Sequence, residues 1–81
     1  MSKTIHVEYY AILREQRGIS SEVLTSAAET AGALFDELCA AHGFTVTPDM
    51  LKVVVNEEFS AWGHPLNDGD TVVFIPPVAG G

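Results

Sequence analysis

The two glycines that end this sequence are its best candidates for chemistry. Gly80 and Gly81 follow the stretch Pro76-Pro77-Val78-Ala79. Because glycine has no side chain, these residues can enter a narrow channel in another protein and present the Gly81 carboxylate there. A terminal carboxylate is ionised at pH 7, so it becomes an acyl donor only after activation, for example as an adenylate. An adenylate can accept sulfur and become a thiocarboxylate. The alternative is an inert chain end, the ordinary fate of a terminus.

The other candidates for chemistry favour structural roles. His6, His42 and His64 are expected on a strand, at a helix end and in a turn, without the spacing of a metal site. Cys39 lies at the edge of an apolar helix stripe, which indicates packing. Adjacent strand residues face opposite ways, so Glu57-Glu58 is better explained as a solvated edge than as an acid and base pair. The sequence therefore predicts no bound cofactor, no metal and no catalytic side chain.

Length and composition indicate one small domain. The 81 residues are 47% hydrophobic, which suffices for a single two-layer core. Eleven acidic against four basic residues give a net charge of −7. This charge has the wrong sign for nucleic acid or anionic lipid. It favours either simple solubility or a basic docking site on another protein.

The same features predict a cytoplasmic protein. Cys39 is the only cysteine, so no internal disulfide can form, and a reducing compartment fits best. The sequence has no apolar signal region near its start and no stretch of about 18 apolar residues. We therefore expect neither export nor a membrane contact.

Alternating β-branched and aromatic residues predict strands at both ends of the chain. In the first, at 4–10, Ile5, Val7 and Tyr9 should face one way and Tyr10 the other. The last strand should end at Pro76, because proline cannot donate to a strand ladder. After the first strand, the patterns predict a short helical turn at 11–16 and a strand at 19–26 that forms an antiparallel hairpin with the first. A central strand at 51–56, buried on both faces, and an extended piece at 59–62 are expected later in the chain. A turn at 64–70 should then lead into the last strand at 71–75.

One long helix is predicted in the middle of the chain. Thr30 is a suitable N-cap, and Gly43 ends the apolar periodicity. Asp36 and Glu37 should lie on the polar side. The predicted buried stripe consists of Ala31, Leu34, Phe35, Leu38 and Ala41.

This order of elements predicts an α+β fold. We expect a β-grasp (ubiquitin-like) roll, in which a mixed sheet of four to five strands packs on one main helix. The first and last strands should be adjacent and central, and a parallel arrangement of the two is one option. The domain is expected to span residues 1–77, and residues 78–81 should leave it as an extended, flexible tail.

Three segments resemble the small subunit of molybdopterin synthase, a family of ubiquitin-like sulfur carriers. They are YYAILRE at Tyr9–Glu15, VNEEFSAWGHPLNDGD at Val55–Asp70 and TVVFIPPVAGG at Thr71–Gly81. The turn and the tail are the specific parts, since a terminal Gly-Gly alone is shared with ubiquitin and several sulfur carriers. Residues 19–49 match only as a strand followed by a helix.

The resemblance implies that sulfur is supplied through Gly80 and Gly81. A ubiquitin-activating-like enzyme would adenylate Gly81 with ATP and Mg, and a sulfur donor protein would help convert it into a thiocarboxylate. The tail would then enter the large catalytic subunit and donate sulfur to cyclic pyranopterin monophosphate, building the dithiolene of molybdopterin. Two small subunits on a dimer of large subunits would form a heterotetramer.

The resemblance also implies which residues bind partners. Tyr10, Phe59 and Ile75 fall at positions where the family presents apolar side chains, although these residues can instead complete the core. Arg14 matches a family element whose role is less defined. The tail residues expected to contact the large subunit are Pro76, Pro77, Val78 and Ala79.

Two other functions stay open. A thiamine-type sulfur carrier or a ubiquitin-like protein modifier would use the same terminal chemistry on another acceptor. A β-grasp interaction module with an inert tail would use none. The sequence identifies neither the activating enzyme nor the sulfur donor, and it leaves the oligomeric state of the isolated chain open.

Overall fold

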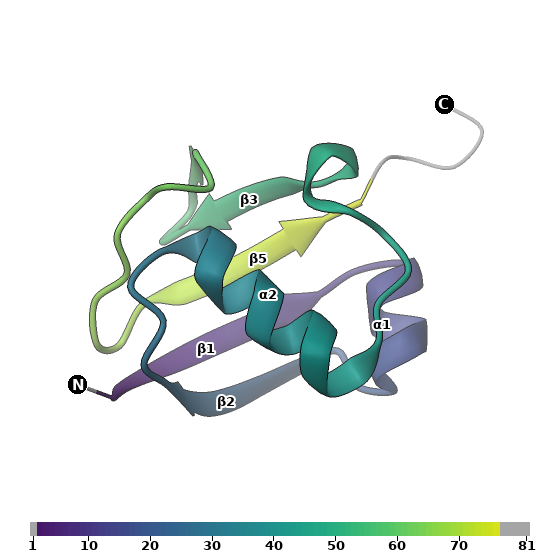
Figure 1. Cartoon of the computed structure of the whole chain (residues 1–81), viewed down its shortest axis with the longest axis horizontal. Helices are drawn as coiled ribbons and strands as arrows, with labels where there is room; N and C mark the ends of the chain where they lie inside the picture. The colour runs from purple at the N-terminus through teal and green to yellow at the C-terminus, as the bar shows by residue number, and fades with distance from the viewer. Residues whose placement is uncertain (1, 77–81) are drawn as a thin grey trace.

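The computed structural model describes residues 2–76 as a single sheet with two helices (Figure 1). The predicted tail at 78–81, and Pro77 before it, lie outside the described residues. The elements in chain order are β1 (Lys3–Tyr9), α1 (Ile12–Arg17), β2 (Ser21–Ser26), α2 (Ala31–His42), the 3₁₀ helix η1 (Pro48–Met50), β3 (Lys52–Val55), β4 (Glu58–Ser60) and β5 (Thr71–Ile75).

The strand order of the five-stranded sheet is β2-β1-β5-β3-β4. β1 and β5 pair in parallel, with Val7 opposite Val72 and Tyr9 opposite Phe74. The other three pairings are antiparallel, including the predicted β1–β2 hairpin. The mixed sheet, the single main helix and the adjacent central positions of the first and last strands are confirmed. The pairing of those two strands is parallel.

The core lies between the sheet and α2, which crosses one face of the sheet (Figure 1). Ile5, Val7 and Tyr9 are buried there, as the alternation in the first strand predicts. At the centre, the ring of Phe35 lies 5.2 Å from the ring of Phe74 on β5. Burial of each such side chain contributes roughly 1.5–3 kcal/mol, so this single layer supplies most of the stability.

The predicted ends of α2 are confirmed. The Thr30 side chain accepts a hydrogen bond from the Ala33 amide over 3.1 Å, and Gly43 ends the helix with φ of 68°. The predicted burial of Ala41 is wrong, because its side chain is exposed. Phe44, from the loop after the helix, packs against Phe35 and closes the core at this end. Because Phe44 covers this end of the core, the apolar stripe of α2 does not have to extend to Ala41 in the last turn of the helix.

The prediction of a central strand at 51–56 buried on both faces is also wrong. β3 lies between β5 and β4, next to the edge of the sheet. Val53 and Val55 are buried against the helix side, whereas Val54 is only half-buried on the opposite face. The apolar run therefore reflects one buried face and one apolar outer face.

The turn at 64–70 ties the start of β5 to the start of β1. Gly69 has a φ of 88°, a conformation that favours glycine, and its amide donates to Thr4 O over 2.7 Å. The Thr4 amide in turn donates to Asp68 Oδ1, also over 2.7 Å. The predicted turn is confirmed, and it fixes the register of the parallel strand pair. Among residues 2–76, no helix is long and apolar enough to cross a membrane.

Candidate docking face

One face of the sheet, which we call the open face, carries neither helix in the described part of the chain. In the sheet register Val54 lies opposite Phe59 on β4 and opposite Val73 on β5, so the three side chains share a face. Ile75 lies two residues after Val73 and therefore points the same way. Tyr10 lines a shallow hollow together with Val54 and Val73. The structure thus brings Tyr10, Phe59 and Ile75 together.

The exposed fractions of Tyr10, Phe59 and Ile75 distinguish a binding surface from residues that complete the core. Phe59 is 76% exposed and Tyr10 is 45% exposed, so neither completes the core. Ile75 is half-buried. An aromatic residue left this open on a small domain, beside half-buried valines, is typical of a binding surface. Their part in partner binding stays a prediction, now with a common location.

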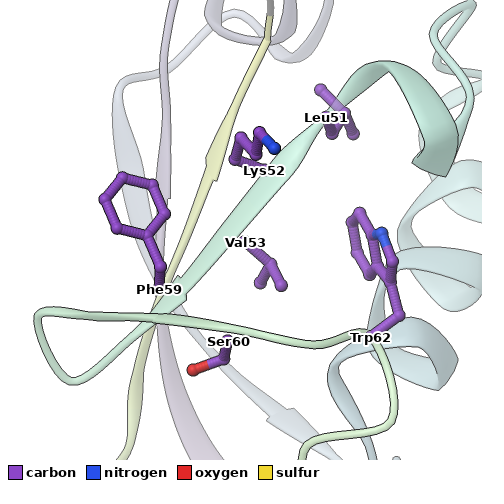
Figure 2. Close-up of a pocket in the computed structure, with 6 residues that line it drawn as sticks. All are labelled: Leu51, Lys52, Val53, Phe59, Ser60 and Trp62. Carbon is purple, nitrogen blue, oxygen red and sulfur yellow. The ribbon is translucent and has the colours of Figure 1, made fainter.

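Figure 2 shows how β4 divides two surfaces at its edge of the sheet. Phe59 points to the open face, whereas Trp62 points to the opposite side, towards α2. The ring of Trp62 lies 5.6 Å from Phe35 and 5.9 Å from Phe74, so it extends the core. Leu51, Lys52, Val53 and Ser60 complete the hollow between the two aromatic residues.

Charged side chains surround the apolar centre of the open face. Glu8 and Glu57 line the hollow that contains Tyr10. Lys52 lies opposite Ile75, the last residue of β5. Glu57 does not belong to a strand, as the sequence suggested, but to the β3–β4 turn, where its φ is 71°. Its exposed carboxylate agrees with the predicted solvated edge.

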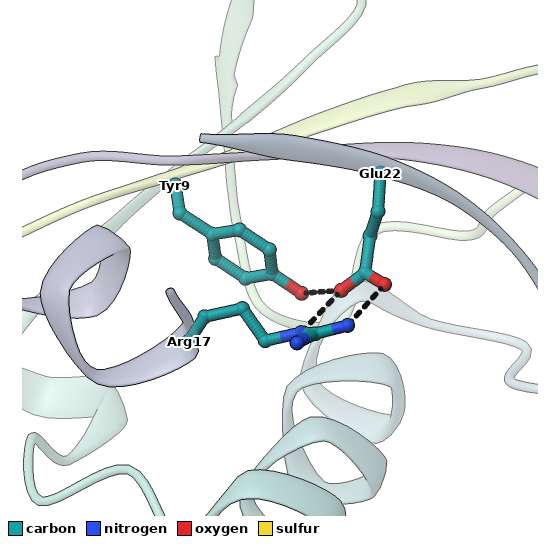
Figure 3. A network of polar contacts seen from close by, with 3 residues as sticks. All are labelled: Tyr9, Arg17 and Glu22. Carbon is teal, nitrogen blue, oxygen red and sulfur yellow. Dashed lines mark hydrogen bonds and ion pairs between the residues drawn. The ribbon is translucent and has the colours of Figure 1, made fainter. Parts of the chain in front are cut away.

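A partly buried hydrogen-bond network lies behind the open face at Tyr9 (Figure 3). The Tyr9 hydroxyl donates to Glu22 Oε2 over 2.6 Å, and Arg17 donates to the same carboxylate through Nε and Nη2 over 3.0 and 2.9 Å. Burial, and then the bond to Glu22, raise the pKa of Tyr9, so its hydroxyl stays protonated. The bond from Arg17 lowers the pKa of Glu22. The network joins β1, α1 and β2.

The backbone at Ala11 sets the direction of the chain after Tyr10. Ala11 has φ of 51° and ψ of −124°, a conformation that non-glycine residues rarely adopt. The Tyr10 carbonyl accepts a hydrogen bond from the Leu13 amide over 3.1 Å, and Leu13 is fully buried. Tyr10 is therefore held between the end of β1 and an anchored α1. This geometry keeps its side chain on the open face.

The other predicted site residues have different locations. Pro76 is the last described residue and is buried, and Arg14 is exposed on α1. Their proposed contacts with partners stay predictions. The residues predicted to react or to form the tail lie outside the described range: they are Pro77, Val78, Ala79, Gly80 and Gly81.

The side chains considered for other chemistry show structural surroundings. Cys39 is half-buried against the core, and burial raises the pKa of its thiol, which opposes nucleophilic reactivity. The His42 ring lies 5.8 Å from the ring of Phe44. Between residues 2 and 76, no group of three or more His, Cys, Asp or Glu side chains is arranged to hold a metal ion.

Sequence reasoning missed the residues that hold the site in place. Asn56 Nδ2 donates to Asp70 Oδ1 over 2.9 Å, and the Thr71 amide donates to Asn56 Oδ1 over 3.0 Å. This contact locks the β3–β4 turn against the start of β5. Both residues stand inside the segment that carries the resemblance, but a polar residue in a turn gives no local sign of a distant partner.

Comparisons with known proteins agree with this geometry. The chain is 32% identical to the molybdopterin synthase sulfur carrier subunit of Escherichia coli, over 95% of this chain and 99% of that protein. Its structure is similar to that of SAMP1 from Haloferax volcanii, with a TM-score of 0.80, 27% identity, and coverage of 96% of this chain and 99% of the other.

A putative molybdopterin converting factor subunit 1 from Pyrococcus furiosus is also similar, with a TM-score of 0.78 and 26% identity over 94% of this chain and 99% of that one. These structures share the β-grasp fold, and the predicted resemblance to the molybdopterin synthase small subunit is confirmed. The pattern of the ThiS family matches residues 7–81. The chain belongs to the ThiS family.

Proposed function

We propose that this chain is a sulfur carrier, the small subunit of a molybdopterin synthase, and that it works through a thiocarboxylate at Gly81. One observation carries the proposal: the similarity to the Escherichia coli sulfur carrier subunit covers nearly the whole of both chains. The family match supports it, because it runs through the last residue, Gly81.

The proposed charging of Gly81 takes two steps. First, a carboxylate oxygen attacks the α-phosphorus of ATP on a ubiquitin-activating-like enzyme, which forms the acyl adenylate and releases pyrophosphate. Second, sulfur at the oxidation level of sulfide, delivered with the help of a sulfur donor protein, attacks the acyl carbon and displaces AMP. Since glycine has no side chain, nothing on Gly81 hinders either attack. The thiocarboxylate carries the negative charge on sulfur.

The proposed transfer returns the carrier to its first state. In the large catalytic subunit, the thiocarboxylate sulfur bonds to a carbon of cyclic pyranopterin monophosphate and displaces an oxygen substituent, which leaves with the electron pair of the broken carbon–oxygen bond. Water then cleaves the acyl–sulfur bond, which leaves the sulfur on the pterin and restores the Gly81 carboxylate. Each sulfur delivered therefore consumes one ATP in recharging. In this proposal the catalytic side chains belong to the partner.

The open face is the proposed surface for docking on the large subunit and on the activating enzyme. Phe59 and Tyr10 would supply the desolvated aromatic contacts that dominate such interfaces. Glu8 and Glu57 at the rim, with the net charge of −7, favour a partner with basic groups around its apolar site. The proposed assembly with the large subunit is a heterotetramer, and the proposed compartment is the cytoplasm.

Protein modification is a second candidate function. The similarity to SAMP1 supports it, since proteins of that name are small archaeal modifier proteins, and the match in fold is as close as to the Pyrococcus furiosus protein. A modifier would use the same adenylate but pass the acyl group to a lysine amine. A thiamine-type carrier would pass sulfur to another acceptor.

Intact mass spectrometry tests the proposal. The full chain is incubated with a molybdopterin-pathway activating enzyme, ATP, Mg²⁺ and a sulfide source. The expected result is a mass gain equal to the exchange of one oxygen for sulfur, which deletion of Gly81 abolishes while the thermal unfolding curve is unchanged. No exchange on the intact chain would overturn the carrier function.

Reconstitution then identifies the acceptor. The charged chain is mixed with a molybdopterin synthase large subunit and the cyclic pterin precursor, and dithiolene formation is measured. Charging without dithiolene formation would exclude the synthase role and favour the modifier or the thiamine-type carrier. Amidation of the Gly81 carboxylate provides a control that keeps every residue in place but blocks adenylation.

A further inference from the structure

β2 forms a free edge of the sheet, and no other element of residues 2–76 pairs with its outer side (Figure 1). The Tyr9 amide donates to Ser20 O over 2.8 Å, which fixes the alternation of the hairpin ladder. Glu22, Leu24 and Ser26 therefore direct their backbone groups inward to β1. The backbone N–H and C=O groups of the alternate residues Ser21, Val23 and Thr25 point outward.

Apart from the charged Glu22, this edge lacks the features that usually prevent strand pairing. Natural edges are blunted by lysine, proline, a bulge or a very short strand. β2 has six residues with neither lysine nor proline, and its pairing with β1 is regular from Ser21 to Ser26. Val23 is 59% exposed. By contrast, the opposite edge strand β4 has three residues, of which only Phe59 directs its backbone groups outward.

The surface next to β2 is acidic. Glu22 lies on β2, and Glu37 on α2 reaches the strand through a hydrogen bond from Ser26. Ala41, one helical turn after Glu37, is small and exposed. Arg17 and Glu22 form an ion pair and compensate each other, and Lys3 Nζ donates to Ala28 O.

We propose that the free edge of β2 is a second docking site, where an extended segment of a partner protein bearing lysine or arginine side chains adds a strand to the sheet. Backbone hydrogen bonds to Ser21, Val23 and Thr25 would give affinity, and the carboxylate of Glu37, together with the net charge of −7, would select basic side chains. A second copy of this chain fits less well, because two chains of charge −7 repel each other.

The site is independent of the proposed function. β1 and β5 separate β2 from β3 and β4, so a segment on the β2 edge leaves Phe59 and Ile75 uncovered. A partner held at β2 can therefore remain bound while another protein occupies the open face.

Nuclear magnetic resonance with model peptides tests this proposal. The full ¹⁵N-labelled chain is titrated with a capped seven-residue peptide that alternates lysine and valine, and separately with one that alternates glutamate and valine. We expect shift changes centred on the amides of Ser21, Val23 and Thr25, with slowed hydrogen exchange there. The lysine peptide should bind about tenfold more tightly at low salt, and its advantage should shrink as salt rises.

Two edge variants and a matched control sharpen the test. Val23→Lys adds a cation to the edge, and Val23→Pro removes an outward N–H; each should weaken binding of the lysine peptide at least about tenfold. Phe59→Lys adds the same charge elsewhere and should weaken binding much less. Thermal unfolding verifies that each variant folds.

Three results would overturn the proposal. The first is shift changes confined to β4 or the open face. The second is equal affinity for the lysine and glutamate peptides. The third is a concentration-dependent change at β2 without peptide, which would show that a second copy of the chain occupies the edge.

Discussion

Asn56 and Asp70 join the β3–β4 turn to the start of β5 through a side-chain hydrogen bond of 2.9 Å. Asp70 is buried, and its second carboxylate oxygen accepts from the Asn67 amide over 2.8 Å. One carboxylate therefore satisfies donors from two separate turns. Phe59 follows the first of these turns, so the contact also holds one side of the open face.

We expect Asp70→Ala to lower the free energy of unfolding by about 2–3 kcal/mol, because it leaves two partly buried donors without an acceptor. Urea denaturation of the purified chain measures the change. Asp68→Ala is a comparison that removes a more exposed carboxylate from the same turn and should cost less. An unchanged unfolding midpoint for Asp70→Ala would contradict the structural role.

Tyr9→Phe removes the hydroxyl that donates to Glu22 but keeps the buried ring. We expect a loss of about 1–2 kcal/mol, since the lost bond joins a buried donor to a charged acceptor. Chemical denaturation monitored by tryptophan fluorescence measures it, because Trp62 packs on the same core. A loss below about 0.5 kcal/mol, the usual range of surface substitutions, would show that water replaces the bond at no cost.

The Glu22 carboxylate should make stability depend on pH. Its pKa is lowered from the usual 4.5, chiefly by the hydrogen bond from Arg17. The folded state therefore favours the ionised form: the stabilisation is complete above the unfolded-state pKa and is lost as pH falls through the folded-state pKa. Glu22→Gln should lower stability at pH 7 and have less effect in the acid range. Denaturation curves of the original chain and of Glu22→Gln, recorded from the acid range to pH 7, measure the difference in the free energy of unfolding. An equal difference at every pH would refute the ionic contribution.

Ala11→Gly should stabilise the protein by about 1 kcal/mol. Glycine adopts the observed φ of 51° without strain, and this gain exceeds the added entropy of the unfolded chain. Glu15→Gly on the exposed side of α1 is the matched control and should destabilise the chain. Thermal denaturation distinguishes the two variants. A lower melting temperature for Ala11→Gly would mean that the alanine conformation is not strained.

Phe59→Ala should weaken binding to a molybdopterin synthase large subunit by about 1–3 kcal/mol, or roughly 5- to 150-fold, with little change in stability. The reason is that Phe59 is 76% exposed on the open face and adds little to the core. Isothermal titration calorimetry measures the affinity. Ile19→Ala removes another exposed apolar side chain, before β2, and should leave the affinity unchanged. Equal effects of the two substitutions would place docking elsewhere.

Local residue patterns were sufficient to predict most of the fold. Alternation identified the buried face of β1, and Thr30 and Gly43 marked the ends of α2, because caps and periodicity depend on residues close in the chain. The sequence did not indicate that Val54 faces outward. A run of valines is equally compatible with a strand buried on both faces and with a strand whose outer face is apolar. Ala41 was misassigned since Phe44 closes the core after the helix.

The site was predictable to a lesser extent. Tyr10, Phe59 and Ile75 were identified through a resemblance, and only the sheet register and the hollow lined by Tyr10 show that they share a face. The supporting contacts of Asn56 with Asp70 and of Tyr9 with Glu22 join residues distant in sequence. No local pattern encodes such pairs. The free edge of β2 likewise depends on the strand order of the whole sheet.

The position of β5 has a consequence for how the sheet is completed. This strand follows the other four strands in the chain, yet it lies in the middle of the sheet between β1 and β3. The two flanking hairpins cannot join until β5 is present, so the sheet closes only at a late step of folding. A polypeptide truncated before β5 would therefore lose its architecture and would be open to proteolysis.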